Sequence, residues 1–384
     1  MGKQNRQRRA EKRRREASRA TARGRRYGIG YEIDALVECA AIVFAEGDHE
    51  GFRKGVATLV AGPPVPGGQA LVDRALAFAL VRAKETARAR GWAPGEVRRV
   101  VQRQLSARHA RLVGAELGSW AAAEGVGRAE AVASAIEVLS WLMRLPPLPT
   151  APARPRAAST DARHLERIRA LLAKAESTTF AEEADALTAK AQELMSRYAI
   201  DQAMLGRAEA ERAPSVRRVW IDDPYAGPKS LLLCEIAGAN RCRSVWGKLF
   251  GFATVFGFEP DLDAVELLFT SLLVQATLGL KANGSRAYRQ SFLIAFATRI
   301  GGRLRGAAQA TVAEATREHG SALAPVLVAD TAAVDDACHR AFPRMTQRSF
   351  SVSSYAGWAA GVTAAELANL STREEIDVLQ KLVV

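Results

Sequence analysis

The chain has 384 residues, 48% of them hydrophobic, and a formal net charge of +13. This length predicts two or three domains, and the apolar content is ample for their cores. No stretch of about 18 uninterrupted apolar residues occurs, which argues against a transmembrane helix. The pair Arg13-Arg14 precedes further charge rather than an apolar segment, which argues against a secretory or twin-arginine signal. The sequence therefore predicts a cytoplasmic protein with no membrane partner.

Most of the net charge lies in residues 1–26, which hold twelve cations and only two anions, Glu11 and Glu16, for a net +10. The cations are Lys3, Arg6, Arg8, Arg9, Lys12, Arg13, Arg14, Arg15, Arg19, Arg23, Arg25 and Arg26. Charge concentrated in this way is typical of a segment that meets a polyanion, because phosphates neutralised by Arg or Lys release counterions. Apart from Lys3, we predict these cations to be nucleic-acid-binding residues.

The same segment has no apolar residue larger than Ala between Gln4 and Arg26, so it cannot bury a core. We expect it to be disordered alone and to fold on binding, as arginine-rich segments do on RNA. A solubilising tail is the alternative, since the chain holds 44 Arg against 10 Lys and arginine is favoured throughout it.

Residues 27–145 are predicted to form a helical domain. Apolar residues at helical spacing predict helices at about 33–46, 69–90, 94–124 and 128–143. Along one side of the second helix lie Leu71, Ala75, Phe78, Ala79 and Arg82. The outer face of the third presents a basic stripe of Arg98, Arg99, Arg103, Arg108 and Arg111. Such a stripe is usually solvated, but beside a basic tail it is also a second candidate contact for phosphates.

Residues 146–160 are predicted to be a linker. Five of the fifteen prolines of the chain fall between Pro146 and Pro155. A segment of this composition is a semi-rigid polyproline spacer, so it marks the clearest domain boundary.

Residues 161–203 are predicted to form an antiparallel helical hairpin. One face of the first helix carries Leu165, Ile168, Leu171, Leu172 and Ala175. Thr179 and Glu182 have the spacing of a capping box that opens the second helix. That helix is expected to bury Ala184, Leu187, Ala191, Leu194, Met195 and Tyr198.

This hairpin resembles the bacterial family known as domain of unknown function 2786 (DUF2786). The resemblance rests on Ile168 to Leu172, Lys174-Ala175-Glu176, Glu182-Glu183-Ala184, Ala189 to Met195, Tyr198 and Ile200-Asp201. Residues 257–266 and 288–293 look like the C-terminal region that often accompanies it. The resemblance implies a bacterial or phage-linked cytoplasmic protein, and it brings no established reaction.

Residues 215–384 are predicted to form an α+β domain. Strands are expected at 216–221, 241–246 and 249–258, with a further short strand at 326–328. Helices are expected at about 229–240, 261–280, 286–319, 331–341 and 356–370. The whole chain is thus predicted to be a predominantly helical α+β protein, with an N-terminal bundle, a hairpin and a small antiparallel sheet with helices on one face.

No motif in the sequence indicates a particular reaction. Phosphate-binding loops, a dinucleotide fingerprint and an HExxH motif are absent from it. The cysteines and histidines are scattered, which predicts small buried thiols, no disulfide scaffold and no metal framework. The carboxylates of Asp222, Asp223, Asp261, Asp263 and Glu266 are numerous enough to hold a divalent cation if they converge. Near a helix start they are also favoured electrostatically without binding any metal.

The sequence therefore favours a non-enzymatic protein that meets RNA or the ribosome through its basic tail, with no cofactor and no metal. Duplex DNA is the next candidate, because phosphate contacts alone do not separate DNA from RNA. A metal-dependent enzyme acting on nucleic acid through the C-terminal carboxylates, and a protein-interaction adaptor, remain open as alternatives.

Overall fold

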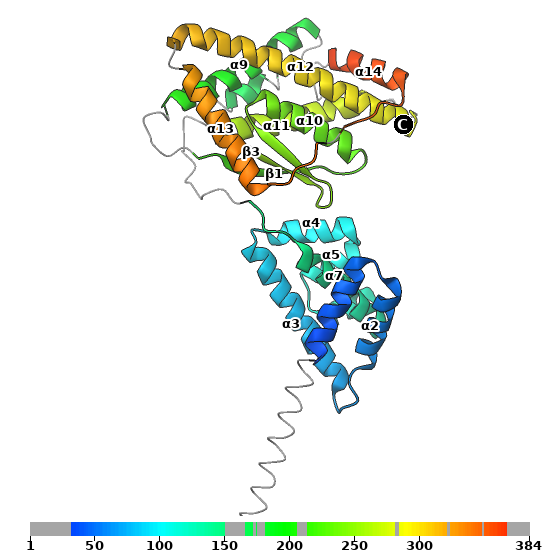
Figure 1. Cartoon of the computed structure of the whole chain (residues 1–384). Helices are drawn as coiled ribbons and strands as arrows, with labels where there is room; N and C mark the ends of the chain where they lie inside the picture. The colour runs from blue at the N-terminus through cyan, green and yellow to red at the C-terminus, as the bar shows by residue number, and fades with distance from the viewer. Residues whose placement is uncertain are drawn as a thin grey trace, which may run out of the picture. The chain divides into compact units, whose positions relative to one another are not determined.

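The computed structural model describes residues 32–149, 166–171, 174, 181–205, 213–280, 284–320, 323–347 and 349–366. The chain divides into two compact units, residues 1–148 (unit 1) and residues 149–384 (unit 2). Helices predominate, and unit 2 contains a small antiparallel sheet, so the predicted α+β class is confirmed (Figure 1).

Unit 1 is built from helices alone in the part that the structure describes. Residues 32–46 are helical, and the helices that follow are α2 (His49–Ala61), α3 (Gly68–Ala89), α4 (Pro94–Gln104), α5 (Ala107–Val113), α6 (Leu117–Glu124) and α7 (Arg128–Arg144). Helix α7 is the centre of the unit, because a nearly continuous run of its residues from Ala131 to Leu142 is buried.

The prediction of one helix over 94–124 is wrong, since this stretch forms the three helices α4, α5 and α6. The chain leaves helical geometry at Leu105, where φ is −118° and ψ is −87°. Ser106 then caps α5 by accepting a hydrogen bond from the amide of His109. The cap offers the backbone a local alternative to a continuous helix, so apolar spacing alone did not reveal the break.

The side of helix α3 that faces the core differs from the side predicted from the spacing of its apolar residues. The core side consists of Val72, Leu76, Leu80, Ala83 and Ala87. Of the side predicted from spacing, Leu71, Ala75 and Ala79 are half-buried, whereas Phe78 is 62% exposed. The helix is apolar on two sides, and only one of them is used by unit 1.

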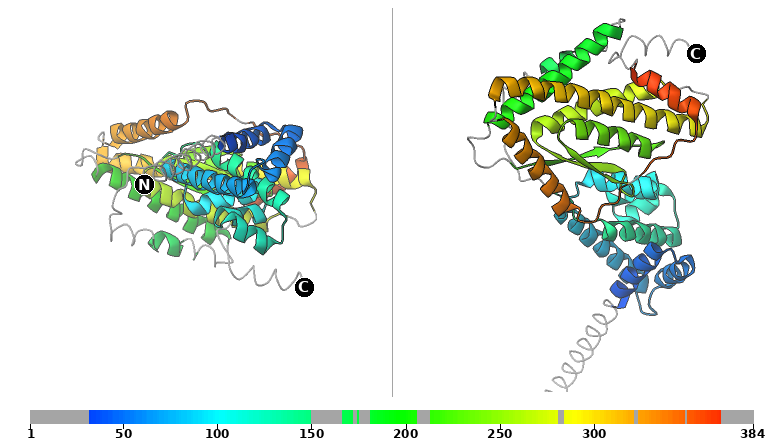
Figure 2. Two further views of the ribbon diagram at one scale, coloured as in Figure 1. Left: turned by 90° about the horizontal axis from the view of Figure 1, so that it is seen from below. Right: turned by 45° about the horizontal axis from the view of Figure 1, so that its top comes forward.

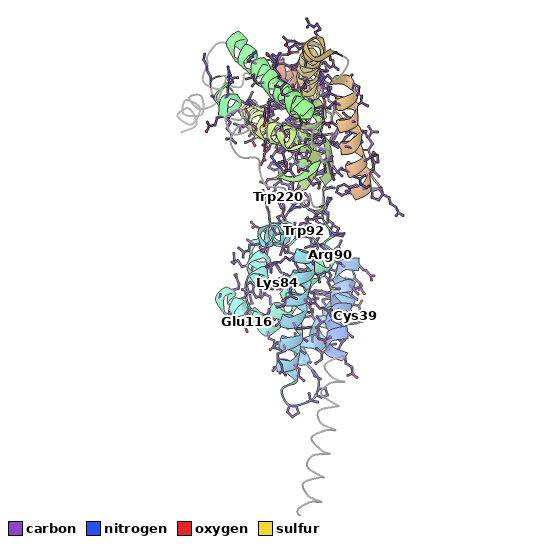
Figure 3. The ribbon with its side chains drawn as sticks, turned by 90° about the vertical axis from the view of Figure 1, so that its left-hand side faces the viewer. Cys39, Lys84, Arg90, Trp92, Glu116 and Trp220 are labelled. Carbon is purple, nitrogen blue, oxygen red and sulfur yellow. The ribbon has the colours of Figure 1, made fainter. Side chains whose placement is uncertain are left out.

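The end of unit 1 is hydrogen-bonded to the turn between α3 and α4, which carries Arg90 and Trp92, both labelled in Figure 3. The guanidinium of Arg90 donates to the carbonyl of Leu145 over 2.6 Å, and Trp92 Nε1 donates to the carbonyl of Pro146 over 2.8 Å. The amide of Leu148 returns a bond to the carbonyl of Arg90. The first residues of the predicted linker are therefore held by unit 1, and residues 150–160 lie outside the described residues.

Unit 2 contains a three-stranded antiparallel sheet of order β1 (Ser215–Trp220), β3 (Phe252–Gly257) and β2 (Arg243–Gly247). The register pairs Val216 with Phe256 and Val245 with Thr254. The predicted strands near 216–221, 241–246 and 249–258 are thus confirmed with small shifts of their ends.

Helices cover both faces of this sheet, which corrects the prediction that they lie on one face. On one face, Ala253 and Val255 join the main core with α10 (Ala226–Ala239) and α11 (Glu259–Leu278). On the other, Phe256 packs with Val334 and Cys338 of α13 (Leu323–Ala341). Every residue of β3 is buried, as expected of a strand covered on both faces.

The remaining helices of unit 2 surround α12 (Arg286–His319), whose bounds match the predicted 286–319. Helix α9 (Ala181–Leu205) packs near its C-terminal half, where Ile200, Ala315 and Leu323 form a small core cluster. The predicted strand at 326–328 is wrong, because these residues belong to α13. A short apolar run does not by itself distinguish a strand from a piece of helix.

Helix α14 (Tyr355–Glu366) packs on the N-terminal half of α12 at very short range (Figures 1 and 2). A Cβ added to Gly357 would lie 2.3 Å from the carbonyl oxygen of Tyr288, and one added to Gly361 would lie 2.3 Å from that of Phe292. Ser291 Oγ accepts hydrogen bonds from the amides of Ser353 and Ser354, which fixes the entry into α14. Small residues thus allow the two helix backbones to touch.

Candidate nucleic-acid interface

The predicted nucleic-acid-binding residues, Arg6 to Arg26, lie outside the residues that the structure describes, so their assignment stays a prediction. The described helix at 32–46 is joined to α3 by an ion pair between Glu38 and Arg82. The first described helix, which follows the basic segment in the sequence, therefore lies beside α3.

The basic stripe predicted on residues 94–124 is divided between α4 and α5 in the structure. Arg108 forms an ion pair with Glu130 of α7 over 2.5 Å. Arg111 forms two bonds to Glu124 of α6, at 2.6 and 2.9 Å. Two of the five arginines of the predicted stripe are therefore engaged in ion pairs between helices, and Arg98 and Arg99 of α4 keep exposed side chains.

The C-terminal carboxylates meet arginines in the structure. Arg217 of β1 binds Asp263 at 2.7 Å, Glu259 at 2.8 Å and Glu266 at 3.0 Å. These three carboxylates follow one another at helical spacing along α11. Burial lowers the pKa of Arg217, but the bond to Asp263 and the neighbouring charges outweigh it, so the pKa of this guanidinium is raised. The cluster joins β1 to α11.

The other acidic candidates are separate from this cluster. Asp261 is buried and pairs with Arg241 at 2.7 Å. The backbone carbonyl of Asp222 accepts a bond from Lys229, whose pKa burial lowers. Within the described ranges, no group of three or more His, Cys, Asp or Glu side chains is arranged to hold a metal ion.

The segment that carries the family resemblance is part of the core of unit 2. Ile168, Ala191 and Met195 are buried in the main core, with Leu171 and Leu194 packed against it. The exposed side of α9 carries short-range ion pairs, such as Lys190 to Glu193 at 2.6 Å. The predicted capping box at Thr179 and Glu182 lies outside the described residues and side chains.

The cysteines differ from the prediction that all four are buried. Cys242 and Cys338 are buried, whereas Cys39 and Cys234 are exposed, and all four are free thiols. Burial raises the pKa of Cys242 well above its usual range, so this thiol is unreactive in the folded protein.

The imidazole of His109 has a polar side chain close to each of its two nitrogens. Its Nδ1 lies 2.7 Å from Ser106 Oγ and its Nε2 lies 2.8 Å from Glu137. The imidazole is buried between α5 and α7; Ser106 is hydrogen-bonded to Nδ1, whereas Nε2 lies close to Glu137 without forming a hydrogen bond.

Sequence reasoning missed the outer side of α3. Phe78 is 62% exposed and Val81 is 47% exposed, and the exposed side chains of Arg74, Glu85 and Arg88 lie on the same side. Their spacing of four, three, four and three residues places all five on one helical face, here called the α3 outer strip. The exposed side could have been predicted from the sequence, because α3 carries more apolar residues than one core-facing side requires.

Unit 2 is thus a predominantly helical α+β unit in which α9, the second helix of the hairpin segment, packs against α11, α12 and α13. The family model described as a protein of unknown function (DUF2786) matches residues 163–202, so the resemblance of this segment is confirmed. Neither the curated proteins nor the solved structures contain a match to the chain. No helix in the described part of the chain combines the length and apolar character needed to cross a lipid bilayer.

Proposed function

We propose that this protein binds nucleic acid through the basic residues of segment 1–26, with RNA or the ribosome as the favoured partner and DNA as the second. One observation carries the proposal: this segment holds +10 of the net charge of +13. A local excess of this size attracts a polyanion and releases its counterions on binding.

The ion pairs of arginines in the two folded units support the proposal. Arg108, Arg111, Arg128, Arg197, Arg217, Arg241, Arg243, Arg299 and Arg305 each pair with a carboxylate. These pairs neutralise charge inside the fold and join separate helices and strands. The uncompensated charge is consequently concentrated in the basic segment.

The test is the salt dependence of binding to RNA, duplex DNA and ribosomes. If about six phosphates are neutralised, affinity should fall by about a thousandfold between 50 and 200 mM salt. A chain that starts at Tyr27 should lose most of this dependence. Reversal of charge at Arg98, Arg99 and Arg103 should remove a smaller part.

Two controls separate the mechanisms. Replacement of every arginine in the segment by lysine keeps the charge but removes the planar guanidinium, so retained affinity indicates an electrostatic anchor and lost affinity indicates structured recognition of RNA. The chain that starts at Tyr27 should keep its thermal midpoint, because the removed residues offer no apolar surface. Absence of salt-dependent binding of the full chain at 50 mM salt contradicts the proposal and favours a protein-interaction adaptor.

A further inference from the structure

The α3 outer strip consists of Arg74, Phe78, Val81, Glu85 and Arg88, and its apolar part is left uncovered by unit 1. The core of unit 1 is completed by the opposite side of α3, with Val72, Leu76 and Leu80. Phe78 is therefore not needed to fill the core, yet it presents most of an aromatic ring to solvent. Aromatic side chains are enriched at binding surfaces relative to the rest of a protein surface.

The charges of the strip favour an anionic partner. Arg74 and Arg88 are exposed, and neither forms an ion pair with another residue in the described part of the chain. Glu85 is the opposing charge on the strip, so its net charge is positive. Arg82 lies beside the strip but is paired with Glu38.

The strip lies close to the first described helix, which follows the basic segment in the sequence. Glu38 lies six residues after the start of the described helix, a distance of about 9 Å at 1.5 Å per residue. Phe78 lies about one helical turn from Arg82, the partner of Glu38. The strip therefore lies near the helix at 32–46, which follows the basic segment in the sequence.

We propose that the α3 outer strip binds single-stranded nucleic acid, with Phe78 stacking on an unpaired base and Arg74 and Arg88 contacting phosphates on either side. This inference rests on the proposed function and adds to it a preference for unpaired bases. Stacking platforms flanked by cations are the usual means of binding single strands.

The size of the apolar surface argues against a second copy of this chain as the partner. A stable protein interface buries about 800 Å² on each partner, whereas one aromatic side chain contributes about 150–250 Å². Phe78 with Val81 provides the area of one stacked base rather than that of a dimer interface.

The experiment compares binding of a 20-nucleotide polyuridine strand and of an RNA duplex of similar length to the full chain by fluorescence anisotropy. Phe78→Ala should weaken binding of the single strand by about 5- to 150-fold, the range measured for loss of one stacked base, and leave duplex binding unchanged. Phe78→Trp should retain the affinity, because it keeps an aromatic face. Val328→Ala removes an equally exposed apolar side chain from α13 and should have no effect.

The charged residues give an independent measurement. Arg74→Ala and Arg88→Ala should each reduce the slope of log affinity against log salt by about 0.7, whereas Phe78→Ala should leave that slope unchanged. Glu85→Gln should strengthen binding of both nucleic acids, because it removes a negative charge from the strip. The thermal midpoint of Phe78→Ala should stay that of the parent chain, since the ring is exposed.

The outcomes separate this inference from the proposed function. If the full chain binds with the expected salt dependence but Phe78→Ala binds the single strand normally, or loses duplex binding equally, the stacking site is wrong and the basic segment alone binds. If light scattering shows a dimer that Phe78→Ala dissociates, the partner is a second copy and this inference is overturned. If the full chain binds neither of these RNAs, this inference fails, and the proposed function is then decided by its own measurements on duplex DNA and ribosomes.

Discussion

The side-chain amide of Gln192 on α9 donates a hydrogen bond to Oδ1 of Asn240, at the end of α10, over 3.1 Å. The same amide lies 3.2 Å from Ser196 Oγ, and Nδ2 of Asn240 donates to the carbonyl of Ile236. Both side chains are buried. Gln192 belongs to the segment that matches the family model, whereas Asn240 does not. This polar contact therefore fixes the family segment to the α+β elements of unit 2.

Gln192→Ala should lower the free energy of unfolding of unit 2 by about 1–3 kcal/mol, because Asn240 Oδ1 would be left buried without a donor. In a domain of this size the thermal midpoint should fall by about 2–4 °C per kcal/mol, measured by circular dichroism. Lys190→Ala, on the exposed side of α9, is the matched control and should change stability by less than about 0.5 kcal/mol.

A double-mutant cycle tests the pairing itself. The combination of Gln192→Ala with Asn240→Ala should cost less than the sum of the single changes, since the second removes the acceptor that the first leaves unpaired. Strict additivity would mean that the two side chains contribute to stability separately.

Gly357→Ala should detach or displace α14, because the new Cβ would lie 2.3 Å from the carbonyl oxygen of Tyr288. That neighbour is backbone and cannot rotate away, so we expect a loss of about 1–3 kcal/mol, as for other overpacked positions. Faster amide exchange confined to α14 and to the facing half of α12 is the expected signature.

Gly302→Ala is the control for this change, since it adds the same methyl group to a helix of unit 2 where no atom lies within 4 Å. It should stabilise α12 slightly, by about 0.4–1 kcal/mol, because alanine restricts the unfolded chain. Equal behaviour of the two variants would show that the close contact of α14 with α12 is not formed.

Secondary structure was predicted correctly where residues close in the sequence determine it. The predicted bounds of the helix at 286–319 match the structure, where Ser285 caps its start and Gly320 follows its end. The break after Gln104 was missed, although Ser106 is a good helix cap. The spacing of apolar residues continues across the break, so it predicts one helix even though Ser106 can start a new one.

Tertiary arrangement was predicted less well, even where the sequence held a signal. The run from Phe252 to Phe256, apolar except for Thr254, is typical of a strand covered on both faces, whereas the sequence analysis predicts helices on one face alone. The spacing of Glu259, Asp263 and Glu266 places three carboxylates on one face of α11. Only the folded chain shows that Arg217 from β1 lies against them, because no local rule specifies that partner.

Trp92→Phe should release the end of unit 1 from the turn between α3 and α4. The change keeps a buried ring but removes the donor to the carbonyl of Pro146, for a loss of about 0.5–1.5 kcal/mol. Amide exchange at Leu148, which donates to the carbonyl of Arg90, should become faster. Hydrogen-exchange mass spectrometry of a peptide that covers residues 145–149 measures this directly.

Trp120→Phe is the matched control, because Trp120 Nε1 also donates to a backbone carbonyl, that of Arg108, over 3.0 Å. It should lower the stability of unit 1 by a similar amount without faster exchange at 145–149. If both variants affected that peptide equally, the effect would reflect general loosening of unit 1 rather than loss of the bond from Trp92.

The last prediction concerns the acid dependence of unit 1. The two hydrogen bonds from Arg111 to Glu124 lower the pKa of that carboxyl, against a smaller opposing effect of burial. A lowered pKa in the folded state means that the stabilisation is complete above the unfolded value of about 4.3 and is lost as the pH falls through the folded value. Arg111→Met should therefore destabilise unit 1 at pH 7, and the difference from the parent chain should shrink below about pH 4. Thermal midpoints measured by circular dichroism from pH 7 to pH 3 test this.

Arg98→Met makes the same change of charge on a neighbouring helix where the structure describes no ion pair with Arg98. Its difference from the parent chain should not follow this pH dependence, and a similar convergence at low pH for both variants would mean that net charge, rather than the bond to Glu124, sets the effect.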